Sequence, residues 1–554
     1  MIEISDLRGV PLLSQTAPED LARMAESAAD LRLGVGEYAV HEGDPRALFV
    51  VLAGKIEVTK SIDGIARTIG WRAPGQIFGE IPLVFGIPFQ GSYRAHEPSR
   101  VMRIEAAQFH TLVAASPETL TQVAALARER IGGLQGIAST PAKSRATLLG
   151  HRWDTACGQL RSFLTRNQIK FDWLMPDAPD LAARWPGTAV QPGDLPALHC
   201  DDGTTLIRAS TREVAQRLGL QTSARGRDYD TVILGGGPAG LAAAVYGASE
   251  GLRTIVIERE APGGQAETSS RIENYLGFPT GVSGDELARR ALEQARRMGA
   301  EIIVTRPAVG IDPSTRTVRL EGGEALHART IVIATGVTWR RLAIEGFDRL
   351  LGKGVHYGAS RSEANMTQGR DIHLIGAGNS AGQAAIFFAS HARAVTLVVR
   401  GDSLAKSMSH YLIEQLRGKS NIHVALRSEV KAIHGDDQLK AIDLVDHDSG
   451  VVRRQDSSGV FVFIGADAET SWLPDEIARD ERGYVLTGEA TVKAGRWRED
   501  RDPYLLETSV PGIFGCGDVR SSPVKRVAAA VGEGSMAIAF IHQFLQRSAR
   551  ATAR

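Results

Sequence analysis

The stretch TVILGGGPAG, residues 231–240, decides the fold of the largest part of this chain. Its first four residues, TVIL, are β-branched or apolar and predict a buried strand, and its glycines predict a tight turn that opens a helix over residues 241–251. The first N–H groups of such a helix lack partners within it and carry partial positive charge, so they favour a diphosphate. The candidate dinucleotide contacts here are Gly235, Gly237, Pro238, Ala239 and Gly240.

The same pattern recurs in IHLIGAGNSA, residues 372–381. An apolar strand again leads into a glycine turn and an apolar helix, which predicts a second dinucleotide site. Its candidate contacts are Gly376, Gly378, Asn379, Ser380 and Ala381. Two dinucleotides on one chain imply electron transfer between them. The alternative, that both are packing turns without a ligand, fits less well because the strand and helix context is present twice.

The residue at the end of the strand after each turn indicates which dinucleotide binds. After the first turn this strand ends at Glu258, whose carboxylate suits ribose hydroxyls and repels a 2′-phosphate, which favours FAD or NAD. After the second turn no carboxylate stands at that place, and Arg400 follows the strand, with Lys406 nearby. A guanidinium there favours NADPH, although Asp402 is an alternative partner for Arg400.

Length and composition set limits on the class of protein. A chain of 554 residues is too long for one core and favours about three to five domains. Its 64 basic and 64 acidic side chains cancel, which gives no electrostatic case for nucleic acid or an anionic membrane. Three cysteines argue against a disulfide scaffold and for a reducing compartment. With no signal peptide and no charge-free apolar stretch long enough for a bilayer, we expect a cytoplasmic protein.

Four further stretches resemble the low-molecular-weight thioredoxin reductases: residues 259–278 (REAPGGQAETSSRIENYLGF), 334–336 (ATG), 512–519 (GIFGCGDV) and 525–530 (KRVAAA). The resemblance implies an FAD in the first site, with Asp518 on its ribitol chain and a helix N-terminus facing the pyrimidine edge of the flavin. The residues it assigns to FAD are Gly264, Gln265, Asn274, Thr335, Gly336, Gly517, Asp518, Arg526, Val527 and Ala528.

The resemblance also implies the order of the domains. An NADPH domain, residues 346–463, is inserted into an FAD domain formed by residues 228–345 and 464–554. Two strands then connect the domains, and rotation about them presents nicotinamide to the flavin. Family analogy also implies a homodimer.

The redox dithiol of that family is missing. Gly358 and Arg361 stand about where its CxxC cysteines belong, and no cysteine lies between Cys200 and Cys516. Cys516 lies between glycines of the flavin-binding turn and is interpreted as a buried filler. Reduced flavin is therefore expected to serve a small acceptor such as a quinone or oxygen, or a one-electron protein, as in the ferredoxin- or flavodoxin-NADP reductases. Those enzymes usually carry an aromatic C-terminal extension, whereas this chain ends soon after its last helix, residues 536–546.

Residues 1–138 resemble the cyclic nucleotide-binding domain. The pattern includes FVVLAGKIEV, residues 49–58, which alternates as a sheet would, and FGEIPLV, residues 78–84. In that family the Glu of this Gly-Glu pair takes the ribose 2′-hydroxyl, and Glu80 matches it. Phe89 stands where an arginine neutralises the cyclic phosphate, and losing that contact costs roughly 1.5–3 kcal/mol. We expect a different ligand, or a domain kept as a docking surface.

Residues 140–222 resemble a small thioredoxin-like domain. Helix 156–165, strand 169–174, strand 194–199 with a cis-proline before it, and helix 210–219 follow one another in its order. The active motif falls at residues 154–157, DTAC, which has only the second thiol. Cys157 is read as a buried residue; a relay from flavin to Cys157 or Cys200 is the alternative.

Together these features predict an α/β chain with two Rossmann-like domains, preceded by a β-roll domain and a thioredoxin-like domain. The predicted function is an NADPH-dependent FAD oxidoreductase in which the cofactors carry the chemistry, so no catalytic side chain is named. His356 and His410 lack ligand partners at suitable spacing, which predicts no metal. The alternative is a non-catalytic sensor of redox state or nucleotides, reporting through the first 220 residues.

Overall fold

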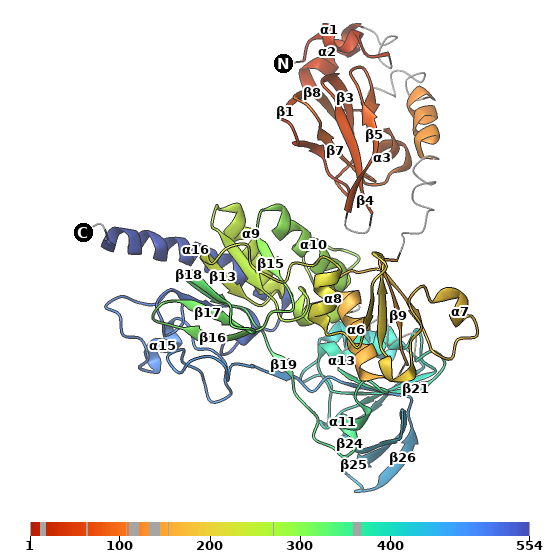
Figure 1. The fold of residues 1–554 in the computed structure, drawn as a ribbon, viewed down its shortest axis with the longest axis vertical. Helices are drawn as coiled ribbons and strands as arrows, with labels where there is room; N and C mark the ends of the chain where they lie inside the picture. Colours follow the sequence, from red (N-terminus) through yellow and green to blue (C-terminus); the bar gives the residue numbers. More distant parts are fainter. Residues whose placement is uncertain are drawn as a thin grey trace. The chain divides into compact units, whose positions relative to one another are not determined.

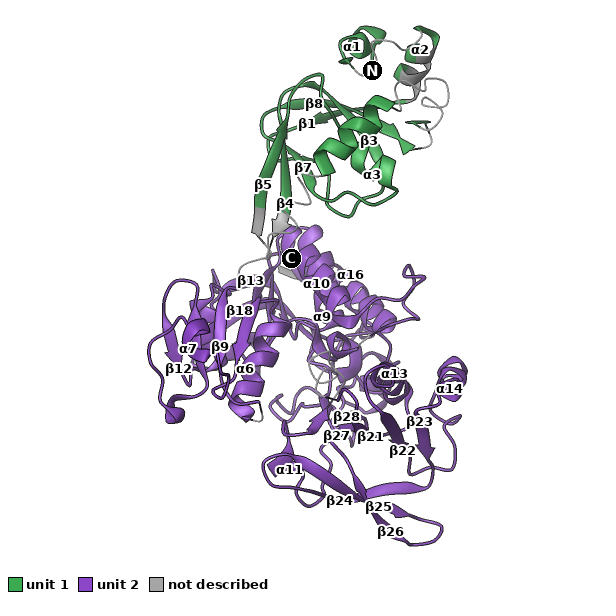
Figure 2. Ribbon diagram, turned by 90° about the vertical axis from the view of Figure 1, so that its right-hand side faces the viewer, with its two compact units in different colours: residues 1–143 green, residues 144–554 purple. Residues whose placement is uncertain are grey.

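The computed structural model describes residues 2–11, 18–62, 65–106, 108–109, 121–131, 144–152, 154–269, 271–357 and 367–552. The chain divides into two compact units, residues 1–143 and residues 144–554, which Figure 2 colours separately.

The first unit consists of two antiparallel sheets with the strand orders β1-β8-β3-β6 and β2-β7-β4-β5. The strands are β1 (Ala29–Leu33), β2 (Tyr38–Val40), β3 (Ala47–Ala53), β4 (Ile56–Ile62), β5 (Ile65–Arg72), β6 (Ile77–Phe78), β7 (Ser92–Ala95) and β8 (Ser99–Glu105). The helices include α1 (Ile4–Arg8), α2 (Pro18–Ser27) and α3 (Glu80–Phe85). Residues 49–58 are sheet as the sequence predicts, but Gly54 divides them into β3 and β4. A Cβ at Gly54 would lie 2.6 Å from the Pro98 carbonyl oxygen, so only glycine fits this turn.

The second unit is built around a seven-stranded sheet with the order β15-β14-β13-β18-β17-β16, in which β29 pairs with β18 (Figure 1). Its strands are β13 (Asp228–Leu234), β14 (Thr254–Ile257), β15 (Glu301–Ile303), β16 (Ala308–Asp312), β17 (Thr317–Leu320), β18 (Ala325–Ile333) and β29 (Ile513–Gly515). The parallel strands are buried, as expected where helices cover the sheet. The helices α9 (Pro238–Ser249), α10 (Gly284–Arg297) and α16 (Val527–Thr552) share one core cluster with them.

Helix α16 is longer than the predicted last helix, residues 536–546, because it is continuous with the helix predicted to begin at residues 526–528. Among the described residues it is the one helix, over Val527–Arg550, that is long and apolar enough to cross a membrane. Ala537, Ile538 and Ile541 are fully buried in the core that α16 shares with α9. The apolar face of α16 therefore serves packing within this unit.

A second parallel sheet, with the order β20-β27-β21-β22-β23, lies in the inserted segment. Its strands are β20 (Val355–Tyr357), β21 (Asp371–Ile375), β22 (Ala394–Val398), β23 (Ile422–Ala425) and β27 (Gly459–Val462). It is accompanied by α11 (Phe347–Leu350), α13 (Asn379–Phe388), α14 (His410–Arg417) and the antiparallel strands β24 (Ser428–Gly435), β25 (Leu439–Asp446) and β26 (Val452–Asp456). The chain enters through β19 (Thr338–Trp339) and leaves through β28 (Ala466–Asp467), and these two strands pair with each other.

Residues 144–222 form a four-stranded sheet with the order β10-β9-β11-β12. Its elements are β9 (Ala146–Leu149), α6 (Thr155–Arg166), β10 (Phe171–Leu174), α7 (Leu181–Arg184), η2 (Pro192–Asp194), β11 (Ala197–Cys200), β12 (Thr205–Ile207) and α8 (Thr211–Arg217). The bond between Leu195 and Pro196 is cis, directly before β11, as the sequence predicts. This sheet belongs to the same compact unit as the two parallel sheets.

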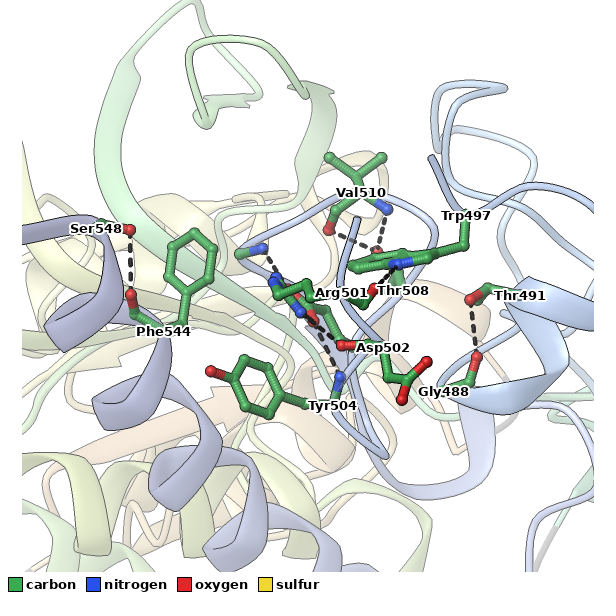
Figure 3. Close-up of polar contacts among 12 residues, drawn as sticks. Gly488, Thr491, Trp497, Arg501, Asp502, Tyr504, Thr508, Val510, Phe544 and Ser548 are labelled. Atoms are coloured by element: carbon green, nitrogen blue, oxygen red, sulfur yellow. Dashed lines mark hydrogen bonds and ion pairs between the residues drawn. The ribbon is translucent and has the colours of Figure 1, made fainter. Parts of the chain in front are cut away.

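The segment between α15 (Glu489–Lys493) and β29 is fixed by a buried carboxylate. Glu507 is fully buried and accepts two bonds from Arg501, each 2.7 Å, and one each from the N–H groups of Tyr504 and Gly512. Figure 3 shows Arg501 beside Trp497 and Tyr504, and its guanidinium lies 4.9 Å from each ring centre. Every oxygen of the buried charge is thus satisfied, which stabilises the entry to β29.

Candidate functional site

The first glycine turn forms where the sequence predicts it. β13 ends at Leu234 and α9 begins at Pro238, with Gly237 as its N-cap. A Cβ at Gly235 would lie 2.5 Å from the Ala334 carbonyl oxygen, and a Cβ at Gly240 would lie 1.9 Å from the Gly235 carbonyl oxygen. The turn therefore packs backbone against backbone, and larger residues do not fit.

Glu258 is held against this turn. It is 8% exposed, and its carboxylate accepts hydrogen bonds from the N–H groups of Gly236 (2.7 Å) and Glu260 (2.9 Å). Burial raises the pKa of this carboxyl. The structure thus places the predicted ribose-binding group beside the predicted diphosphate-binding turn.

Four further predicted residues lie in the loops beside the same turn. A Cβ at Gly264, in the short helix η3 (Gly264–Thr268), would lie 2.9 Å from the Gly237 Cα. The amide of Gln265 donates to the Val337 carbonyl oxygen, directly after Thr335 and Gly336. The loop after Glu258 and the loop after β18 are thereby joined at the first glycine turn.

The turn after β29 completes this cluster. A Cβ at Gly517, in the short helix η4 (Gly517–Val519), would lie 3.0 Å from the Ala239 Cβ, and a Cβ at Gly534 of α16 would lie 2.1 Å from the Ala239 carbonyl oxygen. Asp518 is half-buried and has no hydrogen bond or ion pair with any described residue. Burial raises the pKa of the Asp518 carboxyl. A half-buried carboxylate without a protein partner is suited to hydroxyl groups of a ligand.

Sequence reasoning missed Glu533 on α16. Its carboxylate accepts a hydrogen bond from the Gly517 N–H (2.7 Å) and pairs with Arg520 (2.8 Å), which fixes the Gly517 turn to α16. No motif in the sequence marks Glu533, since its partners lie in a separate turn.

The remaining residues assigned to the first site are less constrained. Asn274 is exposed and has no hydrogen bond within the described part of the chain. Val527 is the first residue of α16, and Ala528 beside it is exposed. Arg526 is exposed and donates to the Lys525 carbonyl oxygen. The contacts therefore bring the glycines, Glu258 and Asp518 together, and the role of Asn274 stays a prediction.

The second glycine turn follows β21 in the same way. A Cβ at Gly376 would lie 2.4 Å from the Phe463 carbonyl oxygen, and α13 begins at Asn379 with Gly378 as N-cap. The Asn379 side chain is engaged with Ser409, accepting from its N–H (2.7 Å) and donating to its hydroxyl (2.9 Å). Ser380 is exposed and Ala381 is buried. Asn379 therefore positions the segment before α14 rather than presenting a free amide.

The two residues predicted to bind the 2′-phosphate, Arg400 and Lys406, differ in whether they are paired within the chain. Lys406 pairs with Asp402 at 2.8 Å. Arg400 is exposed and has no ion pair or hydrogen bond with any residue that the structure describes. The alternative pairing of Asp402 with Arg400 is therefore not formed, and the guanidinium is available to an anion.

All three thiols are buried. Burial raises the pKa of Cys157 and of Cys200 to about 11 and that of Cys516 to about 12. Asp154, at the first position of the expected CxxC, accepts a hydrogen bond from the Cys157 N–H (2.7 Å) as N-cap of α6. Gly358 and Arg361 lie outside the described residues.

In the nucleotide cradle that the resemblance implies for the first unit, Phe89 and Glu80 contact other protein groups. Phe89 is 1% exposed, with its ring centre 5.9 Å from that of Phe49 and 5.8 Å from that of Tyr93. Glu80 is 1% exposed and pairs with Arg130, from the helical segment 121–131, at 3.0 Å. The group assigned to ribose thus has a partner within the chain.

Comparison with known proteins gives two family matches. Residues 229–534 match the pyridine nucleotide-disulphide oxidoreductase model, and residues 31–116 match the cyclic nucleotide-binding domain model. The 34.2 kDa protein in the rubredoxin operon of Clostridium pasteurianum is 31% identical over 320 residues, 58% of this chain and 98% of that protein. Thioredoxin reductase of Bacillus subtilis is 32% identical over 321 residues, 57% of this chain and 95% of that protein.

A solved structure supports the same assignment. Thioredoxin reductase of T. acidophilum matches with a TM-score of 0.52 and 28% identity, over 57% of this chain and 99% of that chain. The fold match, the family match over more than half of the sequence and the two glycine turns agree. The chain belongs to the pyridine nucleotide-disulphide oxidoreductase family.

Proposed function

We propose that this protein is an NADPH-dependent FAD oxidoreductase that passes reducing equivalents to an acceptor without a protein dithiol. The observation that carries the proposal is the presence of two strand–glycine turn–helix units in one compact unit, linked by the paired strands β19 and β28. When bound, the two dinucleotides supply the hydride chemistry. The protein groups bind and orient them.

The first site fits FAD. Glu258 is aimed at the turn and suits ribose hydroxyls, while its charge disfavours a 2′-phosphate. Asp518 offers an unpaired carboxylate to the hydroxyls of a ribitol chain. The N-terminus of α16, packed on α9, offers free N–H groups to an electron-rich ring edge. Gly264, Gln265, Thr335 and Gly336 form the wall beside the turn.

The second site fits NADPH. The free N–H groups at the start of α13 suit the diphosphate, and Arg400 is available to a 2′-phosphate. Rotation about β19 and β28 is the proposed means of bringing this site to the flavin. We also propose the four-domain division 1–138, 140–222, 228–345 with 464–554, and 346–463, in a cytoplasmic homodimer.

The burial of the three cysteines bears on which electron acceptor the protein uses. Disulfide reduction requires an accessible thiolate, whereas Cys157, Cys200 and Cys516 are buried with raised pKa values. We therefore propose a small-molecule acceptor such as a quinone or oxygen. A ferredoxin- or flavodoxin-NADP reductase activity is the second candidate, and a non-catalytic sensor is the third.

Anaerobic stopped-flow mixing with NADPH, followed by an acceptor screen, separates these functions. Bleaching of the flavin band and sustained turnover with ferricyanide or a quinone are expected. Turnover with ferredoxin or flavodoxin but not with quinones would favour the second candidate. A flavin that NADPH leaves oxidised would favour the sensor, and colourless protein that does not take up FAD would end the enzymatic proposal.

A further inference from the structure

One side chain of the four-stranded domain, residues 144–222, reaches the loop that follows β14. Arg166 is the last residue of α6, and its guanidinium donates to three oxygens in that loop. The acceptors are Glu267 Oε2 at 2.9 Å, Glu260 Oε2 at 2.6 Å and the Ala261 carbonyl oxygen at 3.3 Å. A single guanidinium thus ties together two carboxylates and the backbone between them.

The loop that follows β14, residues 259–268, packs directly against the first glycine turn. The Gly263 N–H donates to the Gly236 carbonyl oxygen at 2.8 Å. A Cβ at Gly236 would lie 3.3 Å from the Pro262 Cα, so the two backbones are in close contact. The loop begins directly after Glu258, the carboxylate proposed to bind ribose. The position of the loop therefore sets the shape of the proposed FAD site.

The four-stranded domain is attached to the seven-stranded sheet at a second place, along the edge strand β15. The Gln221 carbonyl oxygen accepts from the Val304 N–H at 2.9 Å, and the Gln221 amide donates to Glu301 at 2.5 Å. The Ile303 carbonyl oxygen in turn accepts from the Glu258 N–H at 2.9 Å. The residue proposed to bind ribose is therefore connected to this domain by two routes, one through the loop and one through β15.

The charge of Arg166 also suits its place beside the loop. The side chain of Glu267 is 9% exposed, and burial raises its pKa to about 7, a shift that the guanidinium opposes. Burial likewise raises the pKa of Glu258, and the charge of Arg166 opposes this shift too. A diphosphate at the adjacent turn adds further negative charge, so a cation fixed here stabilises the loop in place.

We propose that Arg166 is a positioning residue for FAD, through which the four-stranded domain holds the loop after β14 in its binding conformation. This rests on the proposed function, which assigns FAD to the first glycine turn. The domain then acts on the flavin site through a guanidinium, and none of its thiols is required. Because coupling between two sites is reciprocal, bound FAD in turn holds the domain against the loop.

The test is the affinity of the full chain, freed of flavin, for FAD, measured by quenching of flavin fluorescence. Arg166→Ala is expected to weaken FAD binding by about tenfold to a hundredfold, because charge-assisted bonds to the loop are lost. Arg166→Lys should recover part of the affinity, since lysine keeps the charge but lacks the fork that spans both carboxylates.

Arg217→Ala is the matched control. Arg217 is likewise the last residue of a helix, α8, and it pairs at 2.8 Å with Asp202 inside the same domain. Its loss should leave the affinity for FAD unchanged. Hydrogen exchange of residues 155–166 tests the reciprocal effect: added FAD should increase their protection in the wild type but not in Arg166→Ala.

A double variant keeps the test decisive if an unpaired Glu267 disturbs folding. Arg166→Ala combined with Glu267→Gln removes the guanidinium and the carboxylate charge together. This protein should still bind FAD about tenfold more weakly than Glu267→Gln alone, because the bonds to Glu260 and Ala261 are lost as well.

The outcomes separate the inference from the function on which it rests. Wild-type affinity in Arg166→Ala, or equal affinity in the double variant and Glu267→Gln, would show that Arg166 does not position the loop, while the proposed function stands. An equal loss of NADP⁺ binding, or an equal loss of FAD binding in Arg217→Ala, would indicate general destabilisation and would also overturn the assignment. Unchanged hydrogen exchange on adding FAD would contradict the coupling. Wild-type protein that takes up no FAD would overturn the proposed function itself.

Discussion

The nucleotide cradles that the sequence indicates in the two units differ in the partners of their charged groups. In the first unit, the carboxylate of Glu80 is already paired with Arg130, and Phe89 fills the place of a phosphate-binding arginine with an aromatic cluster. In the second unit, Asp518 and Arg400 have no partner among the described residues. Both units match nucleotide-binding families by sequence.

A backbone motif and its ligand contacts are therefore separate properties of a protein. The Gly-Glu turn before α3 keeps the backbone of a cyclic-nucleotide cradle, because Gly79 at φ +93° admits no side chain there. Its Glu80 carboxylate, however, is paired with Arg130 through one oxygen, and the other oxygen has no partner among the described residues. A charged group that stays unpaired in a partly buried site has a cost, and a ligand offsets it.

The largest expected effect is on the flavin cradle. Gly240→Ala places a Cβ 1.9 Å from the Gly235 carbonyl oxygen, so the turn must open. We expect this variant to purify without flavin, as judged by absorbance at the flavin band. Gly158→Ala, in helix α6 with open space around the site, is the control and should retain wild-type flavin content. Yellow Gly240→Ala protein would show that the first turn does not hold the dinucleotide.

The second-largest effect is expected from the ion pair between Glu80 and Arg130 in the first unit. Arg130→Ala leaves the buried Glu80 carboxylate without its partner, which costs about 3–5 kcal/mol of local stability. Hydrogen exchange of residues 77–85, followed by mass spectrometry, should show the loss of protection. Arg128→Ala, exposed on the same helical segment, should not change it.

Binding of cyclic AMP is a further test of the cradle in the first unit. Neither the wild type nor Arg130→Ala is expected to bind it, because Phe89 still occupies the phosphate position. Tight calorimetric binding to either protein would contradict the view that this cradle is closed.

The sequence predicts those features that depend on local backbone geometry. Both glycine turns, the carboxylate Glu258 and Arg400 after β22 lie where the spacing places them. A close approach of two backbone segments requires glycine, and a ligand contact at a strand end requires a charged residue. Both can therefore be recognised in the sequence.

The missed features depend on partners distant in sequence. Glu533 supports Gly517, Arg166 reaches Glu260 and Glu267, and Arg130 closes on Glu80. Surface arginines and glutamates are common, so no single position marks these pairs. Helix α16 is longer than the sequence predicts, because it continues through Gly532 and Gly534, two residues of low helix propensity that separate the two predicted parts.

A smaller effect is expected from a carboxylate of the loop proposed to bind flavin. Glu267 pairs with Arg166 at 2.9 Å, yet burial raises its pKa to about 7, above its usual 4.5. A raised pKa gives stability that is present below pH 4.5 and is lost as pH rises through about 7. Lowering the pH from 8 to 5 should thus stabilise the wild type over Glu267→Gln by about 2 kcal/mol, measured by urea unfolding. Parallel curves for both proteins would show that Glu267 is ionised throughout this range.

The smallest effect is expected from the thiols of Cys157 and Cys200. The segment that contains them resembles a thioredoxin-like domain, just as the first unit resembles a cyclic nucleotide-binding domain. A pKa of about 11 leaves roughly one thiolate in a thousand at pH 8, so iodoacetamide should modify Cys157 and Cys200 only after unfolding. The rate in the native protein should rise about tenfold per pH unit, because only the thiolate reacts. Cys157→Ala and Cys200→Ala should keep wild-type turnover with NADPH and ferricyanide. Rapid alkylation of the folded protein, together with loss of turnover, would instead show that electrons pass through a cysteine. Residues 144–222 would then take part in the redox reaction.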